Sequence, residues 1–133
     1  MKSKLGHVYI YVSDLDKSYK FYKELLELLD YKEVTKQEWG FAFINDGISI
    51  WFEKARTGYI DAGYHRKRIG LNHLAFRVTS KEMVDEFVTK FLAKNNVPTL
   101  YESPKYYKEY QESYYAVYFE DPDRIKLEVA YYD

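Results

Sequence analysis

The chain contains 133 residues, of which 20 are Lys or Arg and 21 are Asp or Glu, and its formal net charge at pH 7 is −1. This length corresponds to about one domain, and the balanced charge gives no electrostatic reason to expect a nucleic-acid partner. Cysteine is absent, so disulfide bonds and thiolate metal sites are excluded and a cytoplasmic location is expected. The first residues contain no long apolar run, which argues against a signal peptide, and no apolar run is long enough for a membrane span, so we expect no membrane partner.

The first module, residues 1–54, is predicted to contain a strand, a helix and three further strands. Valine and isoleucine alternate with other side chains along residues 5–12, which is typical of a strand with one buried face. Ser13 and Asp14 are suitable N-cap residues, and apolar residues then recur at intervals of three and four as far as Leu29, which indicates a helix. Three strands should follow, near residues 31–36, 39–44 and 48–53, with a tight turn at residues 45–47.

Residues 55–69 interrupt this pattern and are interpreted as a linker. Their basic run at residues 65–68 could bind a phosphate or carboxylate, although a solvated connector is the simpler interpretation. The opening plan then returns, because residues 71–78 match residues 5–12 with an offset of 66. The second module, residues 70–133, should contain a helix capped by Thr79 or Ser80 and three strands, near residues 99–102, 114–120 and 125–130.

The alternation places two histidines and a glutamate on one face of the predicted sheets. In the first strand of each module the apolar residues face the helix, so His7 and His73 face the other way. In the last strand the same rule puts Glu128 on the side of the histidines. Two imidazoles and a carboxylate suit a divalent metal ion, which would also offset the cost of burying Glu128. A histidine on a strand is more often an ordinary polar residue, so the pattern alone leaves both interpretations open.

The aromatic content is the most unusual feature of the composition, because 16 Tyr and 8 Phe exceed what a core of this size requires. Tyrosines suit half-buried sheet faces, but they can also line a substrate cleft. Alternation also places Arg77 on the face of His73, toward the expected substrate cleft. A buried guanidinium there would need an anion such as Glu53 or a bound carboxylate. The candidate pocket residues, which could equally be cavity filling, are Tyr9, Tyr11, Trp51, Arg77 and Tyr115.

Three segments resemble the vicinal oxygen chelate superfamily of glyoxalases, bleomycin-resistance proteins and extradiol dioxygenases. Leu5-Gly6-His7-Val8 with residues 13–22 resembles its opening strand and helix, residues 71–78 the start of its second module, and residues 118–128 its closing hairpin. Together the segments cover nearly the whole chain in the right order. The resemblance implies an α+β fold of two βαβββ modules that form a U-shaped mixed-sheet cleft, with one main helix per module, usually in a homodimer.

The resemblance also implies a metal site whose ligands come from the first and last strands of each module. Carried over to this chain, they are His7, His73 and Glu128, which would bind Mn, Fe, Zn, Ni or Co within one chain or across a dimer. The fourth ligand position falls on Trp51, whose indole has no acceptor for a metal, although Glu53 lies further out on the same face. This departure argues against a true glyoxalase I or an epimerase. The three-ligand set is more similar to extradiol dioxygenases and fosfomycin-resistance proteins.

The function expected from the sequence is that of a metal-dependent lyase, transferase or dioxygenase. Its small-molecule substrate would chelate the metal through adjacent oxygens. The alternative is a metal-free protein that binds and sequesters a bulky drug of the bleomycin type in an aromatic groove. The intact His-His-Glu set favours the enzyme, whereas the aromatic content and Trp51 favour the binding protein. No acid–base residue can be assigned from the sequence.

Overall fold

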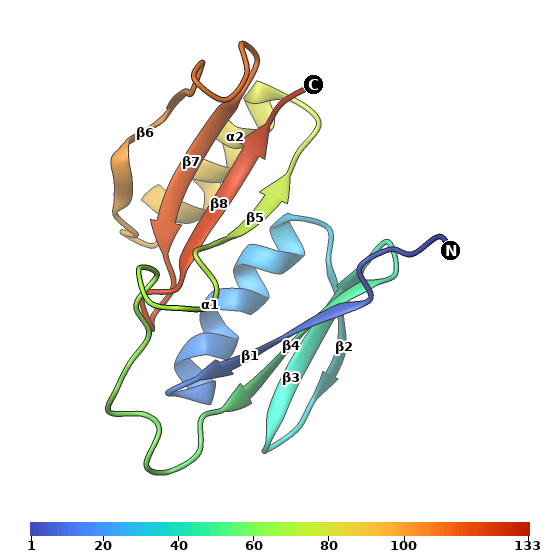
Figure 1. Ribbon diagram of the computed structural model, residues 1–133, viewed down its shortest axis with the longest axis vertical. Helices are drawn as coiled ribbons and strands as arrows, with labels where there is room; N and C mark the ends of the chain where they lie inside the picture. The colour runs from blue at the N-terminus through green and yellow to red at the C-terminus, as the bar shows by residue number, and fades with distance from the viewer. The chain divides into compact units, whose positions relative to one another are not determined.

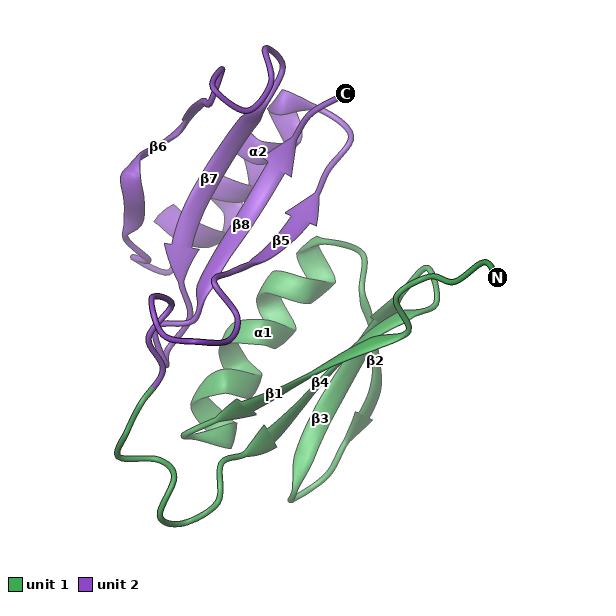
Figure 2. Cartoon of the chain, in the orientation of Figure 1, with its two compact units in different colours: residues 1–63 green, residues 64–133 purple.

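Each half of the chain folds into a sheet of its own with a helical layer of its own, which confirms the predicted duplication. The computed structural model describes residues 1–133, and Figure 2 shows its two units, residues 1–63 and 64–133. Each unit is described by itself. The boundary falls within the segment predicted as a linker, residues 55–69, which contains no helix or strand. None of the helices combines the length and the apolar character needed to cross a membrane.

The first unit contains one helix and four strands in the predicted order. The elements are β1 (His7–Val12), α1 (Leu15–Leu28), β2 (Lys32–Lys36), β3 (Gly40–Asn45) and β4 (Ile48–Lys54). The sheet order is β1-β4-β3-β2, with β1 and β4 parallel and the other neighbours antiparallel (Figure 1). Asp46 and Gly47 both have positive φ between β3 and β4, as a two-residue hairpin turn requires, so the predicted turn is confirmed.

Helix α1 packs its apolar stripe against one face of this sheet, and its N-terminus is capped by Asp14. The Asp14 carboxylate accepts a hydrogen bond from the backbone N–H of Lys17 at 3.0 Å, which satisfies a free donor of the first turn. Tyr22 and Leu25 are fully buried, and the Tyr22 ring centroid lies 4.2 Å from that of Phe52 on β4. Each such burial stabilises the fold by about 1.5–3 kcal/mol.

The second unit repeats the arrangement. Its elements are β5 (Leu74–Arg77), α2 (Lys81–Phe87), a π-helical continuation η1 (Val88–Ala93), β6 (Thr99–Tyr106), β7 (Tyr115–Glu120) and β8 (Lys126–Tyr131). The sheet order β5-β8-β7-β6 is equivalent to that of the first unit, again with one parallel pair (Figure 1). Ser80 caps α2 by accepting from the N–H of Met83 at 3.3 Å.

Alternation along β8 separates a buried apolar face from a polar one, as predicted. Leu127 and Val129 are fully buried on the helical side, where Phe119 of β7 lies 5.4 Å from Phe87 of α2 between ring centroids. Glu128 therefore belongs to the opposite face of the sheet. This face is the one on which the sequence places the candidate ligands of the second unit.

Strand β6 departs from the prediction in length and regularity. It extends to Tyr106, and its register with β7 shifts between Leu100 and Lys105. Tyr101 and Glu102 lie in this shift with φ of 59° and 56°, a left-handed conformation that non-glycine residues rarely adopt. A bulge of this kind leaves no periodic signal in the sequence, so the predicted strand ended at residue 102.

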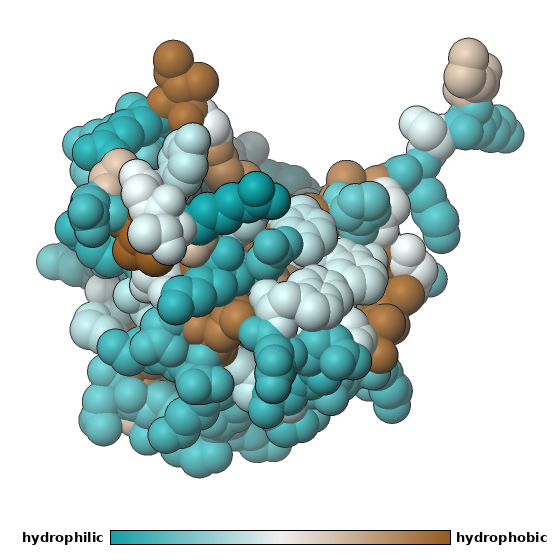
Figure 3. Space-filling view, turned by 90° about the horizontal axis from the view of Figure 1, so that it is seen from below, coloured by the Kyte–Doolittle hydropathy of each residue, from teal (hydrophilic) through white to brown (hydrophobic).

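The surface presented in Figure 3 is mostly hydrophilic, with pale residues of intermediate hydropathy and small hydrophobic patches between the polar groups. Tyrosine and tryptophan belong to this intermediate class, and many of them are accessible. The tyrosines and tryptophans with at least about half of their surface exposed are Tyr9, Tyr11, Trp39, Tyr59, Tyr101, Tyr106 and Tyr110. The aromatic content is therefore only partly explained by the core.

Candidate functional site

His73 and Glu128 meet on the polar face of the second sheet. Nε2 of His73 lies 2.9 Å from Oε2 of Glu128, whose side chain is 1% exposed against 33% for the histidine. The strand register produces this contact, because Glu128 pairs with Ala75 of β5 and His73 lies two residues earlier on the same face. The structure thus brings together two of the three ligands predicted from the sequence.

The other polar atoms of the pair are already engaged. Nδ1 of His73 lies 2.7 Å from the amide oxygen of Asn72, and the Tyr114 hydroxyl donates to Oε1 of Glu128 at 2.6 Å. Since an amide oxygen only accepts, Nδ1 donates this hydrogen bond, and Nε2 is the ring nitrogen that faces the carboxylate. Oε2 is buried and receives no hydrogen bond, although Nε2 is within ion-pair distance. Two acceptors so close need a cation between them, either a proton or a metal ion.

A tyrosine-lined cavity of about 410 Å³ opens beside this pair, entirely within the second unit. Burial and the Glu128 carboxylate raise the pKa of Tyr114 and of Tyr118, so both hydroxyls stay protonated and remain donors. The lining residues are Asn72, His73, Tyr101, Tyr107, Tyr110, Tyr114, Tyr118, Lys126 and Glu128.

The first unit carries a partly exposed aromatic row on β1, on β4 and at the residue just before β3. The Trp51 ring is nearly parallel to those of Tyr9 and Trp39, with centroid separations of 6.4 and 6.3 Å. The Tyr9 hydroxyl donates to Oε2 of Glu53 at 2.7 Å, and the Trp51 indole donates to the Ser49 hydroxyl at 2.9 Å. Glu53 is thereby held by a tyrosine of its own unit.

His7 lies on β1, exposed, and pairs in register with Ser49. Within neither unit does the structure gather three or more His, Cys, Asp or Glu side chains in a metal-binding group. Tyr11, about half exposed, lines a shallow pocket of the first unit with Ala55, Arg56 and Tyr59. The full predicted ligand set therefore remains a proposal.

Two pocket predictions need correction. Arg77 is exposed rather than buried: its guanidinium donates to the Tyr132 carbonyl at 2.7 Å and lies 4.4 Å from the centre of the Tyr132 ring, so it needs no anion. Tyr115 lies on the helical side of β7, where its hydroxyl donates to Asp85 at 2.7 Å. The cavity is lined instead by Tyr114 and Tyr118, which lie on the other side of the same segment. The burial of Val117 and Phe119 marks the helical face of β7, and alternation from them would have found Tyr118.

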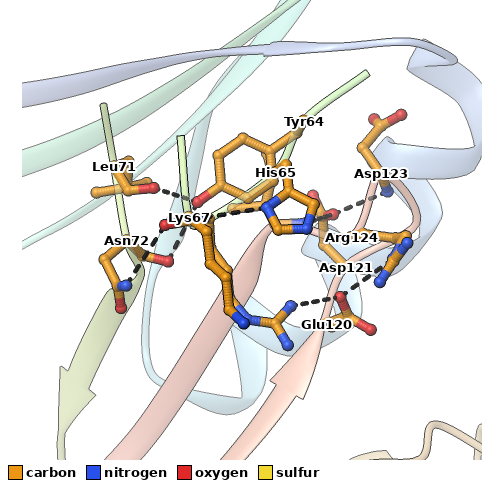
Figure 4. Close-up of polar contacts among 11 residues, drawn as sticks. Tyr64, His65, Lys67, Leu71, Asn72, Glu120, Asp121, Asp123 and Arg124 are labelled. Atoms are coloured by element: carbon orange, nitrogen blue, oxygen red, sulfur yellow. Dashed lines mark hydrogen bonds and ion pairs between the residues drawn. The ribbon is translucent and has the colours of Figure 1, made fainter. Parts of the chain in front are cut away.

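The second half of the predicted linker is mostly exposed, but hydrogen bonds and an ion pair hold it in place. Figure 4 shows that the Tyr64 hydroxyl donates to the carbonyl groups of Leu71 and Asn72, the latter at 3.1 Å. Arg66 forms an ion pair with Glu120 of β7 at 2.9 Å. These contacts hold residues 64–72 together and attach them to β7, next to His73.

Paired βαβββ repeats with a histidine and a glutamate on the polar face of a sheet define a protein of the vicinal oxygen chelate fold. The sequence profile of the Glyoxalase/Bleomycin resistance protein/Dioxygenase superfamily matches residues 4–129. The chain belongs to this superfamily.

Related proteins cover nearly the whole chain. The uncharacterized protein YqjT of Bacillus subtilis strain 168 is 39% identical over 126 residues, which are 95% of this chain and 97% of YqjT. The crystal structure of a candidate glyoxalase from Bacillus halodurans is 36% identical with a TM-score of 0.88 and covers 96% of this chain and 95% of that one. The fosfomycin resistance protein FosX of Listeria monocytogenes, at 24% identity, has the same fold with a TM-score of 0.71 over 100% of this chain and 96% of that one.

Proposed function

We propose that this protein is a metal-dependent enzyme whose divalent ion (Mn, Fe, Zn, Ni or Co) is bound by His73, Glu128 and His7. Its substrate would be a small molecule that chelates the ion through adjacent oxygens. The observation that carries the proposal is the approach of Nε2 of His73 to Oε2 of Glu128 at 2.9 Å, while Nδ1 of His73 already faces the amide oxygen of Asn72. Two lone pairs this close need a cation between them, and we propose that a metal ion rather than a proton takes this place.

The donor set and its surroundings fit a metal. Two donors about 2.1 Å from one ion and at right angles to each other lie about 3 Å apart, which is close to the observed separation. Metal-binding histidines commonly donate their other N–H to a fixed acceptor, and Asn72 provides that acceptor here. Tyr114 holds the second carboxylate oxygen in the same way. A FosX variant of the same fold was solved with Mn(II), so this fold can accommodate a divalent ion.

His7 enters the proposed ligand set because it is the residue of the repeat equivalent to His73. It would be supplied by the same chain or by a second copy in a homodimer. The metal would act as a Lewis acid that stabilises negative charge developing on the chelating oxygens. The tyrosines of the cavity would pack the substrate, exclude water and donate hydrogen bonds, since Tyr114 and Tyr118 remain protonated. Trp51 at the fourth position argues against glyoxalase I among the reactions of the superfamily.

Metal analysis of purified protein tests the proposal. The native protein should take up about one divalent ion per chain. His73→Ala should lose most of this uptake while keeping its circular dichroism spectrum. His65→Ala is the matched control, because His65 only accepts a hydrogen bond from the backbone of Lys67. If the native protein takes up no Mn, Fe, Zn, Co or Ni under any loading condition, the proposal fails.

The alternative, a metal-free protein that sequesters a bleomycin-type drug, is favoured by one observation. Five tyrosines line the cavity of the second unit, and flat aromatic walls suit a bulky planar ligand. Calorimetric titration of EDTA-treated protein with metal-free bleomycin separates the two functions. Tight binding together with no metal uptake would favour the binding protein over the enzyme.

A further inference from the structure

Lys126 is a cation of the cavity that no metal-binding role uses. It is the first residue of β8 and lies on the same face as Glu128, with which it lines the cavity. Its Nζ lies 4.7 Å from the ring centre of Tyr118 and 4.8 Å from that of Tyr101. The ammonium group is thus placed over two aromatic faces and remains partly exposed.

The carboxylate of the residue that pairs with Lys126 in the sheet is engaged by two arginines. Glu120 pairs directly with Lys126 across β7 and β8. Its Oε2, however, accepts from Arg66 at 2.9 Å and from Arg124 at 3.4 Å, and Figure 4 shows Glu120 beside Arg124. Glu120 is therefore bound by two arginines rather than by Lys126.

Tyr101 completes the group from the bulge of β6. Its left-handed backbone, at φ of 59°, costs energy and yet directs a 47% exposed ring to the cavity. Burial alone would raise the pKa of its hydroxyl, but hydrogen bonding and charge from Lys126 and Arg66 hold that pKa below its usual value. The field at the hydroxyl therefore favours negative charge.

We propose that Lys126 and Tyr101 form an anion subsite, which binds a carboxylate or phosphate group of the substrate within the same cavity as His73 and Glu128. The ammonium group and the phenol would each donate to an oxygen of that group, and such charge-assisted bonds are stronger than neutral ones. The inference rests on the proposed function for the use of this cavity. It narrows the substrate to a small anion that also carries chelating oxygens.

Lysine-selective NMR of metal-free protein tests the subsite with two probes, inorganic phosphate and acetate. Added phosphate or acetate should shift the Lys126 ammonium signal, and the ion with the larger response identifies the chemical class. Lys126→Met should weaken binding by about tenfold or more, and Lys126→Arg should retain it. Tyr101→Phe should weaken it less. Lys105→Met is the matched control, since Lys105 also lies over a tyrosine, Tyr107 at 5.3 Å, but does not line the cavity.

Two results would overturn the subsite: neither ion shifts the Lys126 signal of the native protein, or Lys126→Met and Lys105→Met bind equally well. The native titration keeps the test decisive even where a variant does not fold. Metal uptake is measured separately on the same proteins and should persist in Lys126→Met. Loss of anion binding with intact metal uptake therefore concerns the subsite alone, whereas absent metal uptake concerns the proposed function.

Discussion

Trp51 occupies in the first unit the register position that Glu128 occupies in the second. Trp51 pairs with Tyr9 of β1 and Glu128 pairs with Ala75 of β5, and Tyr9 and Ala75 are equivalent residues of the repeat. The backbone is thus duplicated, but the histidine–carboxylate pair is present in only one unit. An indole N–H cannot serve as a metal ligand, so only the second unit has a histidine–carboxylate pair that could bind a metal ion.

Restoring the carboxylate at this position should strengthen metal binding. Trp51→Glu would place a carboxylate near His7 as Glu128 is placed near His73. We expect metal affinity to rise by about tenfold, or ~1.4 kcal/mol, measured by competition with a chelating dye. Trp51→Leu, which removes the indole without adding a ligand, should leave the affinity unchanged. Equal affinities for the two variants would argue against His7 as a ligand.

The sequence predicted the duplication and the facing of His73 and Glu128 because both depend on strict alternation in short buried strands. Leu127 and Val129 fix the face of β8, and this places Glu128 without knowledge of any distance. The strand order could be inferred from the repeat and from the family resemblance. The turn at Asp46 and Gly47 is equally local in origin.

The residues that the sequence analysis missed or misplaced depend on structural features that leave no periodic pattern in the sequence. Tyr101 reaches the cavity from a left-handed bulge. Tyr114 shares the face of Tyr118, but its neighbour Tyr115 was assigned to the pocket in its place. Arg77 shares the predicted face but lies near the end of β8, where Tyr132 provides a carbonyl and a ring outside the cavity. Alternation assigns a side chain to a face, but it does not say how deep the residue is buried.

The Tyr114 hydroxyl should stabilise the protein by supporting buried Glu128. Tyr114→Phe removes the donor to Oε1 at 2.6 Å and leaves that carboxylate oxygen poorly satisfied. We expect the free energy of unfolding of the metal-free protein to fall by about 1–3 kcal/mol, measured by urea denaturation. Tyr110→Phe is the control, because that ring is exposed at the cavity mouth. An equal loss in both variants would show that the Tyr114–Glu128 bond has no special importance.

Asp85 should make part of the stability sensitive to acid. Burial opposes its ionisation, but hydrogen bonds from Lys81 and Tyr115 outweigh burial and hold its pKa below the ordinary 3.8. The folded state therefore binds the proton less readily than the unfolded chain, so this stabilisation is complete above about pH 4 and is lost as pH falls through the lower, folded-state pKa. Asp85→Asn should be less stable than the native protein at pH 7, and the difference should shrink as pH falls below about 4, by urea denaturation at each pH.

The matched control for Asp85 is Glu86→Gln. Glu86 pairs with Lys90 on the exposed side of the same helical segment, with about half of each side chain accessible. Exposed ion pairs of this kind contribute little to the free energy of unfolding. The stability of Glu86→Gln should therefore match that of the native protein at every pH. If Asp85→Asn also follows the native protein from pH 7 to low pH, the hydrogen bonds to Asp85 do not stabilise the fold.

Gly40 should be intolerant of a side chain for steric reasons rather than conformational ones. It begins β3, and a Cβ built on it would lie 2.2 Å from the carbonyl oxygen of Phe52, a backbone atom of β4 that cannot move without disturbing the sheet. Gly40→Ala should lower the free energy of unfolding by about 1–3 kcal/mol, measured by urea denaturation. Gly6→Ala is the control, because a Cβ there meets nothing within 4 Å, and it should leave the stability unchanged. Native-like stability of Gly40→Ala would mean that β3 and β4 separate more easily at this point than their pairing indicates.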